Sequence, residues 1–158
     1  VTTRGVRFTN EANSYHDFMQ GLLAATPAGE PPEAWLVCDH AFIRYYGLGA
    51  VKPAPMPLGP WLANGYLQRG HSLAELAQAC GLPTSALLAT VRDYNAQARD
   101  GKDRDFGKGE TPYNRIQGDA LRARARGLHM HGPAGAGPVL CRESGHGQLG
   151  HLCRFAGQ

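Results

Sequence analysis

The sequence predicts an α+β fold, in which a small mixed or antiparallel sheet of short strands packs against several helices. Short apolar runs such as AWLVC are typical of strands, whereas other segments repeat their apolar residues at helical spacing. Proline and glycine separate the two kinds of segment. The length of 158 residues, with 42% hydrophobic and 18% charged residues, indicates one globular domain with a buried core.

The first half of the chain contains the following expected elements. Residues 5–8 (GVRF) form a short strand candidate. Ser14 and Asp17 make a capping box that starts a helix over residues 15–25. TPAGEPP ends this helix, and AWLVC reads as a buried strand. HAFIRYYG is expected to form a short helix that ends at Gly47.

The second half begins with a proline-rich connection, VKPAPMPLGP, which should run extended over the surface. GYLQRG is a second strand candidate, and Ser72 with Glu75 makes a capping box for a helix over 73–80. Thr84 is expected to cap a helix over 85–99. Residues 101–119 read as a polar loop, and residues 120–158 as an irregular C-terminal tail.

Charge and cysteine usage exclude several classes of protein. The net charge of +3 falls short of the clustered basic surface that nucleic-acid binding needs. No apolar run approaches the roughly 18 residues of a membrane span. The cysteines at positions 38, 80, 141 and 153 lack C-x-x-C spacing, which favours reduced thiols. We therefore expect a soluble cytoplasmic protein with no membrane partner.

Residues 5 to about 119 resemble the substrate-side (cap) region of FAD-dependent oxidoreductases of the fumarate reductase and 3-ketosteroid Δ1-dehydrogenase superfamily. The order of elements carries the resemblance: RFTNE, a strand ending in Asp39, SLAELA, VRDYN, and then DFG. The resemblance implies a cap-domain-like region over 1–119 that covers the substrate. It also implies FAD as the cofactor of a longer parent enzyme, and Val1 in place of Met agrees with a piece of a longer polypeptide.

The resemblance assigns a catalytic role to Tyr15. Fumarate reductases of this superfamily carry a proton-donating arginine four residues after the glutamate of the Asn-Glu pair, and Tyr15 occupies that position here. The ketosteroid dehydrogenase branch has a tyrosine there, thought to take the α-proton of its substrate. By this comparison Tyr15 is the catalytic base, and the partner is a hydrophobic, steroid-like ketone that undergoes 1,2-dehydrogenation.

Physical chemistry sets conditions on this role. A tyrosine has a reference pKa near 10, so acting as a base near pH 7 costs about 1.4 kcal/mol for each unit of deficit. A helix N-terminus offsets about 0.3 to 2 kcal/mol of this. Further hydrogen-bond donors are therefore needed, and the resemblance places them outside this chain. The alternative is that Tyr15 is a packing residue with its hydroxyl at the surface.

Neighbouring residues have expected roles as well. Asn10 and Glu11 are expected to brace the turn, and His16 either positions Tyr15 or is a solvated helix residue. A set of large apolar residues either lines a substrate pocket or belongs to the core: Phe18, Trp35, Tyr45, Tyr46 and Trp61.

No G-x-G-x-x-G follows a strand, and the family's glycine-rich C-terminal flavin segment is missing. The chain is therefore expected to bind no FAD by itself and to be inactive alone, since the flavin-binding domain of the parent is absent. The tail departs from the family after about residue 119. Hypothetical codons for residues 138–155, read one base later, can spell a segment similar to what the branch carries next, so we hypothesise an out-of-frame tail that genomic DNA would test.

Two rival functions use the tail. Cys141, His146, His151 and Cys153 are candidate zinc ligands, with His129 and His131 nearby, although their spacing matches no standard finger. Arg122, Arg124 and Arg126 alternate in a pattern that suits a nucleic-acid backbone, but no aromatic platform accompanies them. Neither rival is favoured over the flavoenzyme interpretation.

Overall fold

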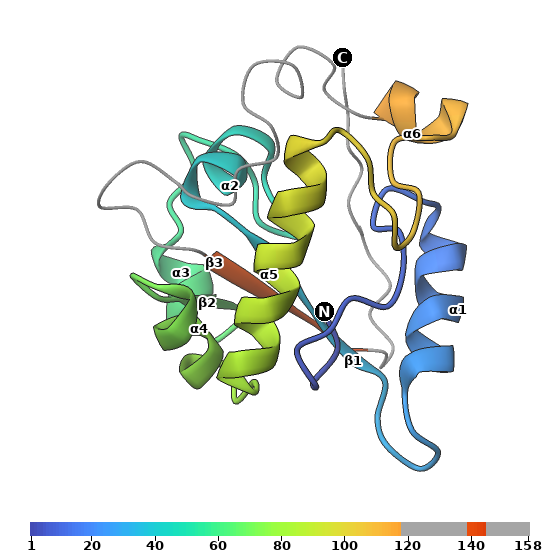
Figure 1. Cartoon of the computed structure of the whole chain (residues 1–158). Coiled ribbons are helices and arrows are strands. Elements are labelled where there is room, and N and C mark those ends of the chain that lie inside the picture. Colours follow the sequence, from blue (N-terminus) through green and yellow to red (C-terminus); the bar gives the residue numbers. More distant parts are fainter. Residues whose placement is uncertain (118–138, 145–158) are drawn as a thin grey trace.

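A computed structural model describes residues 1–117 and 139–144 of the chain (Figure 1). Two of the helices, α1 and α4, begin where the sequence supplies a local start signal. Ser14 accepts a hydrogen bond from the Asp17 amide, and Ser72 accepts one from the Glu75 amide, so the serine half of each predicted capping box is confirmed. In chain order the elements are α1 (Tyr15–Ala25), β1 (Glu33–Cys38), α2 (His40–Tyr46), α3 (Gly59–Ala63), β2 (Leu67–Arg69), α4 (Leu73–Ala79), α5 (Thr84–Arg99), α6 (Pro112–Gln117) and β3 (Val139–Ser144).

The strands of the described residues form one antiparallel sheet in the order β1-β3-β2. β3 pairs with β1 from Glu33 opposite Ser144 to Cys38 opposite Val139, and with β2 along its other edge. β1 and β2 therefore run parallel to each other without being paired, and the strand between them comes from far along the chain. These six residues of β3 lie in the stretch that was predicted to be irregular, so that prediction is wrong for them.

Helices cover both faces of the sheet, because alternate residues of a strand point to opposite faces. Trp35 packs with Leu76, Leu87 and Val91 of α4 and α5. Its neighbour Ala34 packs on the other face with Phe18 and Leu22 of α1. Figure 1 shows α5 passing in front of the strands. On the face of Ala34, a further cluster joins β1, α2 and β2, made of Cys38, Ile43, Leu48, Val51 and Leu67.

Several predicted elements need correction. Residues 5–8 are not a strand, because Gly5 lies in a turn with a φ of 76°. Two backbone hydrogen bonds close this turn, one from the Gly5 amide to the carbonyl of Thr2 and one from the Thr2 amide to the carbonyl of Val6. Thr84 is the first residue of α5 rather than its cap, and Pro83 precedes it without a side-chain cap. α3 lies at the end of the proline-rich connection, and α6 lies in the predicted polar loop.

The other predicted helices and strands are confirmed. α1 spans the predicted residues 15–25, α2 ends at Gly47, and α4 ends just before Gly81, which has a φ of 66°. Two of the predicted strands appear as β1 and β2. Among the described residues, no helix is long and apolar enough to cross a membrane.

Candidate functional site

Tyr15 is the first residue of α1, directly after the capping residue Ser14. The residue as a whole is partly exposed, but its hydroxyl oxygen is buried. The alternative with the hydroxyl at the surface is therefore wrong. Tyr15 therefore lies at the end of α1 where the helix dipole carries partial positive charge.

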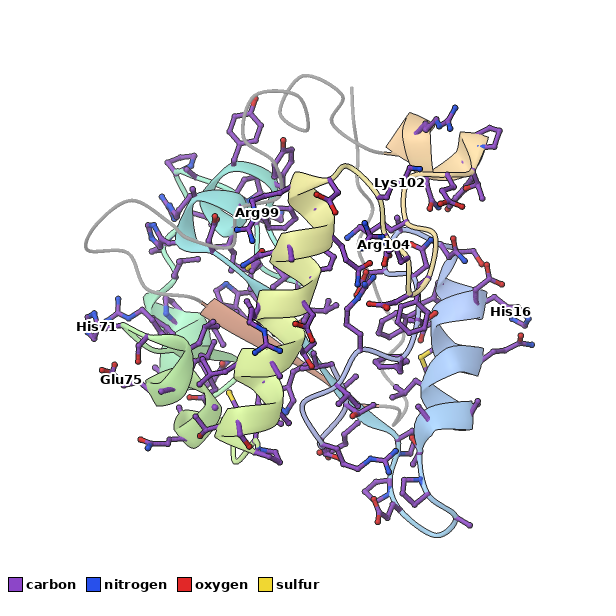
Figure 2. The ribbon with its side chains drawn as sticks, in the orientation of Figure 1. His16, His71, Glu75, Arg99, Lys102 and Arg104 are labelled. Carbon is purple, nitrogen blue, oxygen red and sulfur yellow. The ribbon has the colours of Figure 1, made fainter. Side chains whose placement is uncertain are left out.

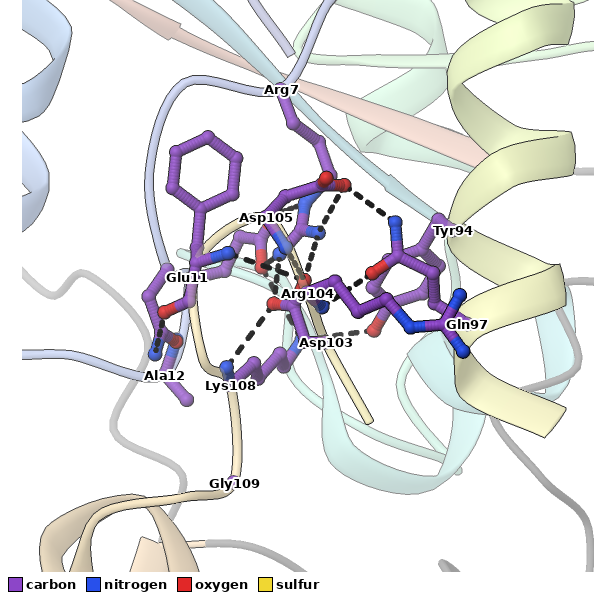
Figure 3. Close-up of polar contacts among 12 residues, drawn as sticks. Arg7, Glu11, Ala12, Tyr94, Gln97, Asp103, Arg104, Asp105, Lys108 and Gly109 are labelled. Carbon is purple, nitrogen blue, oxygen red and sulfur yellow. Dashed lines mark hydrogen bonds and ion pairs between the residues drawn. The ribbon is translucent and has the colours of Figure 1, made fainter. Parts of the chain in front are cut away.

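The loop that leads into α1 is held by Arg7, whose side chain is only 8% exposed. Its Nε and Nη2 donate to Glu11 at 2.8 and 2.9 Å, and its Nη1 and Nη2 donate to Asp103 at 2.9 and 2.8 Å (Figure 3). The guanidinium also lies over the rings of Tyr94 and Phe106, 4.8 and 5.0 Å from their centroids. We call Arg7, Glu11 and Asp103 the arginine clamp.

Electrostatics favour the charged form of each member of the clamp. Burial acts to raise the pKa of Glu11, but Lys108 and Arg7 outweigh it and hold this pKa below its usual value. Burial likewise opposes ionisation of Asp103, and the hydrogen bonds from Arg7 lower its pKa despite that. The pKa of Arg7 is raised, because its two carboxylate partners outweigh the burial.

Lys108 extends this arrangement toward α5. Its Nζ lies 3.2 Å from the hydroxyl of Tyr94 and 3.5 Å from Oε2 of Glu11. Burial lowers the pKa of Lys108, but its interactions with Tyr94 and Glu11 overcome this and raise it. The loop from Asp103 to Lys108 is therefore fastened both to the segment before α1 and to α5.

The expected bracing roles of Asn10 and Glu11 are confirmed. Asn10 accepts a hydrogen bond from the Ala12 amide at 2.9 Å through its side chain, and Glu11 belongs to the arginine clamp. His16 is exposed on the outer side of α1 and pairs with Gln20 at 2.9 Å (Figure 2). Of the two predicted alternatives for His16, the structure therefore supports a solvated helix residue.

The structure does not bring the five apolar candidates together in one pocket. Phe18 and Trp35 are both core residues, and they lie on opposite faces of the sheet. Trp61 packs beside the cluster around Ile43, whereas Tyr45 is 57% exposed. A shallow cavity of about 240 Å³ does exist, but it lies beside α5 away from Tyr15, lined by Leu73, Leu88, Val91, Arg92, Asn95 and Arg99.

Sequence reasoning missed Arg7, Asp103 and Asn114. Arg7 and Glu11 are four residues apart in the quoted stretch GVRFTNEANSYHDF, so their pairing had a local signal. Asp103 lies 96 positions from Arg7, and a single sequence carries no signal for that contact. Asn114 has a weak one, since Thr111 and Pro112 before it are typical of a helix start.

The residues of the rival functions fall mostly outside the described part of the chain. This applies to Arg122, Arg124, Arg126, His129, His131, His146, His151 and Cys153. Cys141 lies in β3, of whose side chains nothing is described. Among the described residues, no cluster of three or more His, Cys, Asp or Glu suits a metal ion.

The described residues do not fit the ADP half of FAD. A dinucleotide site needs a glycine-rich turn between a strand and a helix, with the helix N-terminus free to meet the pyrophosphate. β1 leads into α2 through Asp39, whose carboxylate caps Phe42, and β2 leads into α4 through the capping box of Ser72. Both strand-to-helix turns in the described residues are thus closed by side chains.

A family model described as "FAD binding domain" matches residues 1–138. The chain therefore belongs to this family, whose cofactor is FAD. Among curated relatives, it is 38% identical over 157 residues to the 4-oxocyclohex-2-ene-1-carboxylate 5-dehydrogenase of Sinomonas cyclohexanicum, covering 99% of this chain and 26% of the relative. It is also 38% identical over 124 residues to a 3-oxosteroid 1-dehydrogenase of Mycobacterium tuberculosis, covering 75% of this chain and 22% of that one.

Solved structures agree with the curated relatives. The 3-ketosteroid delta1-dehydrogenase from Sterolibacterium denitrificans, in complex with 1,4-androstadiene-3,17-dione, matches with a TM-score of 0.77 and 28% identity over 90% of this chain and 26% of that one. A fumarate reductase flavoprotein subunit from Lactobacillus plantarum shares the fold, with a TM-score of 0.56 and 22% identity over 90% of this chain and 79% of that one. The chain spans about a quarter of the length of the curated relatives it matches. These matches to flavin oxidoreductases lend no support to the zinc or nucleic-acid alternatives.

Proposed function

We propose that this chain is the substrate-side (cap) part of an FAD-dependent dehydrogenase that desaturates a ring ketone, with Tyr15 as the base that takes a proton next to the carbonyl. The observation that carries the proposal is the place of Tyr15, which is the first residue of α1 and lies four residues after Glu11. A base that works on a carbon acid needs shielding from water and stabilisation of its anion. The start of a capped eleven-residue helix supplies part of the stabilisation of the anion.

The names of the relatives support the proposed substrate class. Each name pairs an oxo group on a ring with dehydrogenation, both for the oxocyclohexene carboxylate enzyme and for the 3-oxosteroid enzymes. A ring ketone is the chemistry they share, and a 3-keto steroid-like compound is the larger member of the class. The tyrosine at the position where fumarate reductases carry arginine argues against a dicarboxylate substrate.

The proposed role of this chain is limited to removing the proton next to the carbonyl. FAD bound by the remainder of the parent enzyme supplies the electron acceptor, and no described residue of this chain fits its pyrophosphate. We therefore propose that the chain alone is inactive. The match to 79% of the separately solved Lactobacillus plantarum chain supports its treatment as one folding unit. A flavin absorbance band that co-purifies with this chain would contradict the proposal that the remainder of the parent enzyme binds FAD.

The test uses the full-length flavoprotein that carries this segment, assayed with a 3-oxosteroid, with 4-oxocyclohexanecarboxylate and with fumarate. Tyr15→Phe should lower kcat for the preferred ketone by about 10²-fold to 10⁴-fold. Tyr113→Phe is the matched control, since Tyr113 is half exposed on α6, and it should keep kcat within about twofold. Near-normal turnover by Tyr15→Phe, or activity with fumarate alone, would reject the proposal.

A further inference from the structure

Asn114, on the short helix α6, is almost completely buried, with 3% of its surface exposed. It contacts the loop that enters α1, although the residues that it meets there lie 101 to 104 positions away along the chain. Burial of an amide side chain is costly unless its polar atoms are hydrogen-bonded. The partners of Asn114 therefore show what its position requires.

The Asn114 amide uses all of its hydrogen-bonding positions. Its Oδ1 accepts from Nδ2 of Asn10 at 2.9 Å and from the Gly109 amide at 3.0 Å. Its Nδ2 donates to the carbonyl of Ala12 at 3.0 Å and to Oδ1 of Asn13 at 3.1 Å. A carboxamide has two acceptor sites and two donors, and all four are filled here.

These contacts fix the backbone directly before Tyr15. Ala12 and Asn13 immediately precede the capping residue Ser14, so one side chain holds both positions that lead into the helix. Asn10 is fixed in turn, because its Nδ2 also donates to the carbonyl of Phe106 at 3.2 Å. The loop before α1 thus has two independent anchors, which are Asn114 near Ala12 and the arginine clamp near Arg7.

We infer that Asn114 is a positioning residue that sets where Tyr15 stands relative to the substrate. The inference rests on the proposed function, since it gives Asn114 a role only through Tyr15. A shift of about 1 Å in a catalytic group lowers turnover strongly without abolishing binding. Loss of Asn114 should therefore act on kcat rather than on KM.

Only asparagine satisfies this site. Asn114→Asp would replace two donors by an oxygen that faces the carbonyl of Ala12 and Oδ1 of Asn13, so two attractions would become repulsions. Asn114→Ala would remove the hydrogen bonds to all four of these groups. The reversed amide orientation is excluded in the same way, because its nitrogen would face the donors of Asn10 and Gly109.

The experiment compares Asn114→Ala and Asn114→Asp with Leu76→Ala in the full-length flavoprotein. Leu76 is fully buried in the cluster with Trp35, on the other side of the sheet from α1, so its loss destabilises the fold without touching the loop. We expect both Asn114 variants to lose about tenfold to a hundredfold in kcat, with KM changed less than about threefold. Leu76→Ala should keep kcat within about twofold for the folded fraction.

Two further measurements separate positioning from a general loss of stability. If Asn114 acts through Tyr15, the double variant Asn114→Ala/Tyr15→Phe should be no slower than Tyr15→Phe alone. Amide exchange over residues 12–16 should accelerate about tenfold in Asn114→Ala and stay unchanged there in Leu76→Ala.

Unchanged exchange over residues 12–16 in Asn114→Ala would overturn the inference, whatever the turnover of Tyr15→Phe. Rapid exchange with an unaltered kcat would also overturn it, provided that Tyr15→Phe is impaired. A normal Tyr15→Phe would instead remove the proposed function on which the inference rests.

Discussion

The guanidinium of Arg7 and the carboxylate of Asp103 meet through two hydrogen bonds of 2.9 and 2.8 Å, although 96 positions separate them in the sequence. Both side chains are more than nine-tenths buried. Two-point pairing of this kind holds both distance and orientation. The contact ties the segment before α1 to the loop after α5, and the position of Tyr15 depends on that segment.

Loss of Arg7 should be severe. Arg7→Leu leaves the Asp103 carboxylate buried without its main partner, so we expect the free energy of unfolding to fall by about 3 to 5 kcal/mol. Arg7→Lys should be intermediate, because an ammonium group lacks the two-point geometry. Urea denaturation of this chain measures both. Arg92→Ala is the control, since its ion pair with Asp93 is fully exposed, and its denaturation midpoint should not move. Equal midpoints for Arg7→Leu and wild type would contradict the prediction.

Acid should weaken the fold through the same carboxylates. The pKa values of Glu11 and Asp103 are lowered in the folded state. The contribution of these carboxylates to the free energy of unfolding is therefore fully present above their unfolded pKa values of about 4. It is lost as the pH falls through the lower folded pKa values. The free energy of unfolding should therefore decrease as the pH is lowered from about 4.5 to about 2.

Asp103→Asn provides the comparison for this pH dependence. The variant should be less stable at pH 7, and its unfolding free energy should fall less steeply over the acid window, because one of the titrating groups is gone. Denaturant titrations at several pH values measure the slope. Parallel curves for Asp103→Asn and wild type would show that Arg7 does not hold the carboxylate ionised.

Gly47 should tolerate no side chain. It ends α2 with a φ of 79°, and an added Cβ would lie 2.5 Å from the carbonyl oxygen of Val51. Gly29 has a similar φ of 86° with open space around it, so Gly29→Ala reports the backbone strain alone, roughly 1 to 2 kcal/mol. Gly47→Ala should be more destabilising than Gly29→Ala by at least about 1 kcal/mol in thermal or urea unfolding. The reverse order would contradict the expected clash.

Cys80 should react slowly with alkylating reagents. Burial raises the pKa of its thiol to about 11, so roughly one thousandth of it is thiolate at pH 8. Iodoacetamide labelling followed by peptide mass spectrometry should show Cys80 unmodified in the folded chain under conditions that label it in urea. Equal labelling rates in the two states would contradict the assigned burial.

Local signals account for what the sequence predicted well. The hydroxyl of Ser14 and the carboxylate of Asp39 each cap a helix within three residues, and such short-range contacts are visible in a single sequence. The strand prediction for residues 5–8 failed because Gly5 turns the chain, which alternation of side chains alone does not reveal. α3 was missed because it is a single turn among prolines.

Long-range contacts account for the rest. The role of Asn114 follows from four partners that lie 5 to 104 positions away, and no spacing rule connects them. β3 was missed because a strand between two others is defined by its partners, not by its own pattern. The proposed role of Tyr15 therefore comes from a family resemblance, whereas the side chains that hold its loop could not be predicted.

The place of β3 has a consequence for synthesis on the ribosome. β1 and β2 leave the exit tunnel well before the strand that joins them, since β2 ends at Arg69 and β3 begins at Val139, so each has an unpaired edge throughout that interval. Such edges are templates for intermolecular pairing. A nascent chain halted before residue 139 would therefore be a substrate for chaperones and an aggregation hazard, whereas the emergence of residues 139–144 from the tunnel allows the sheet to close.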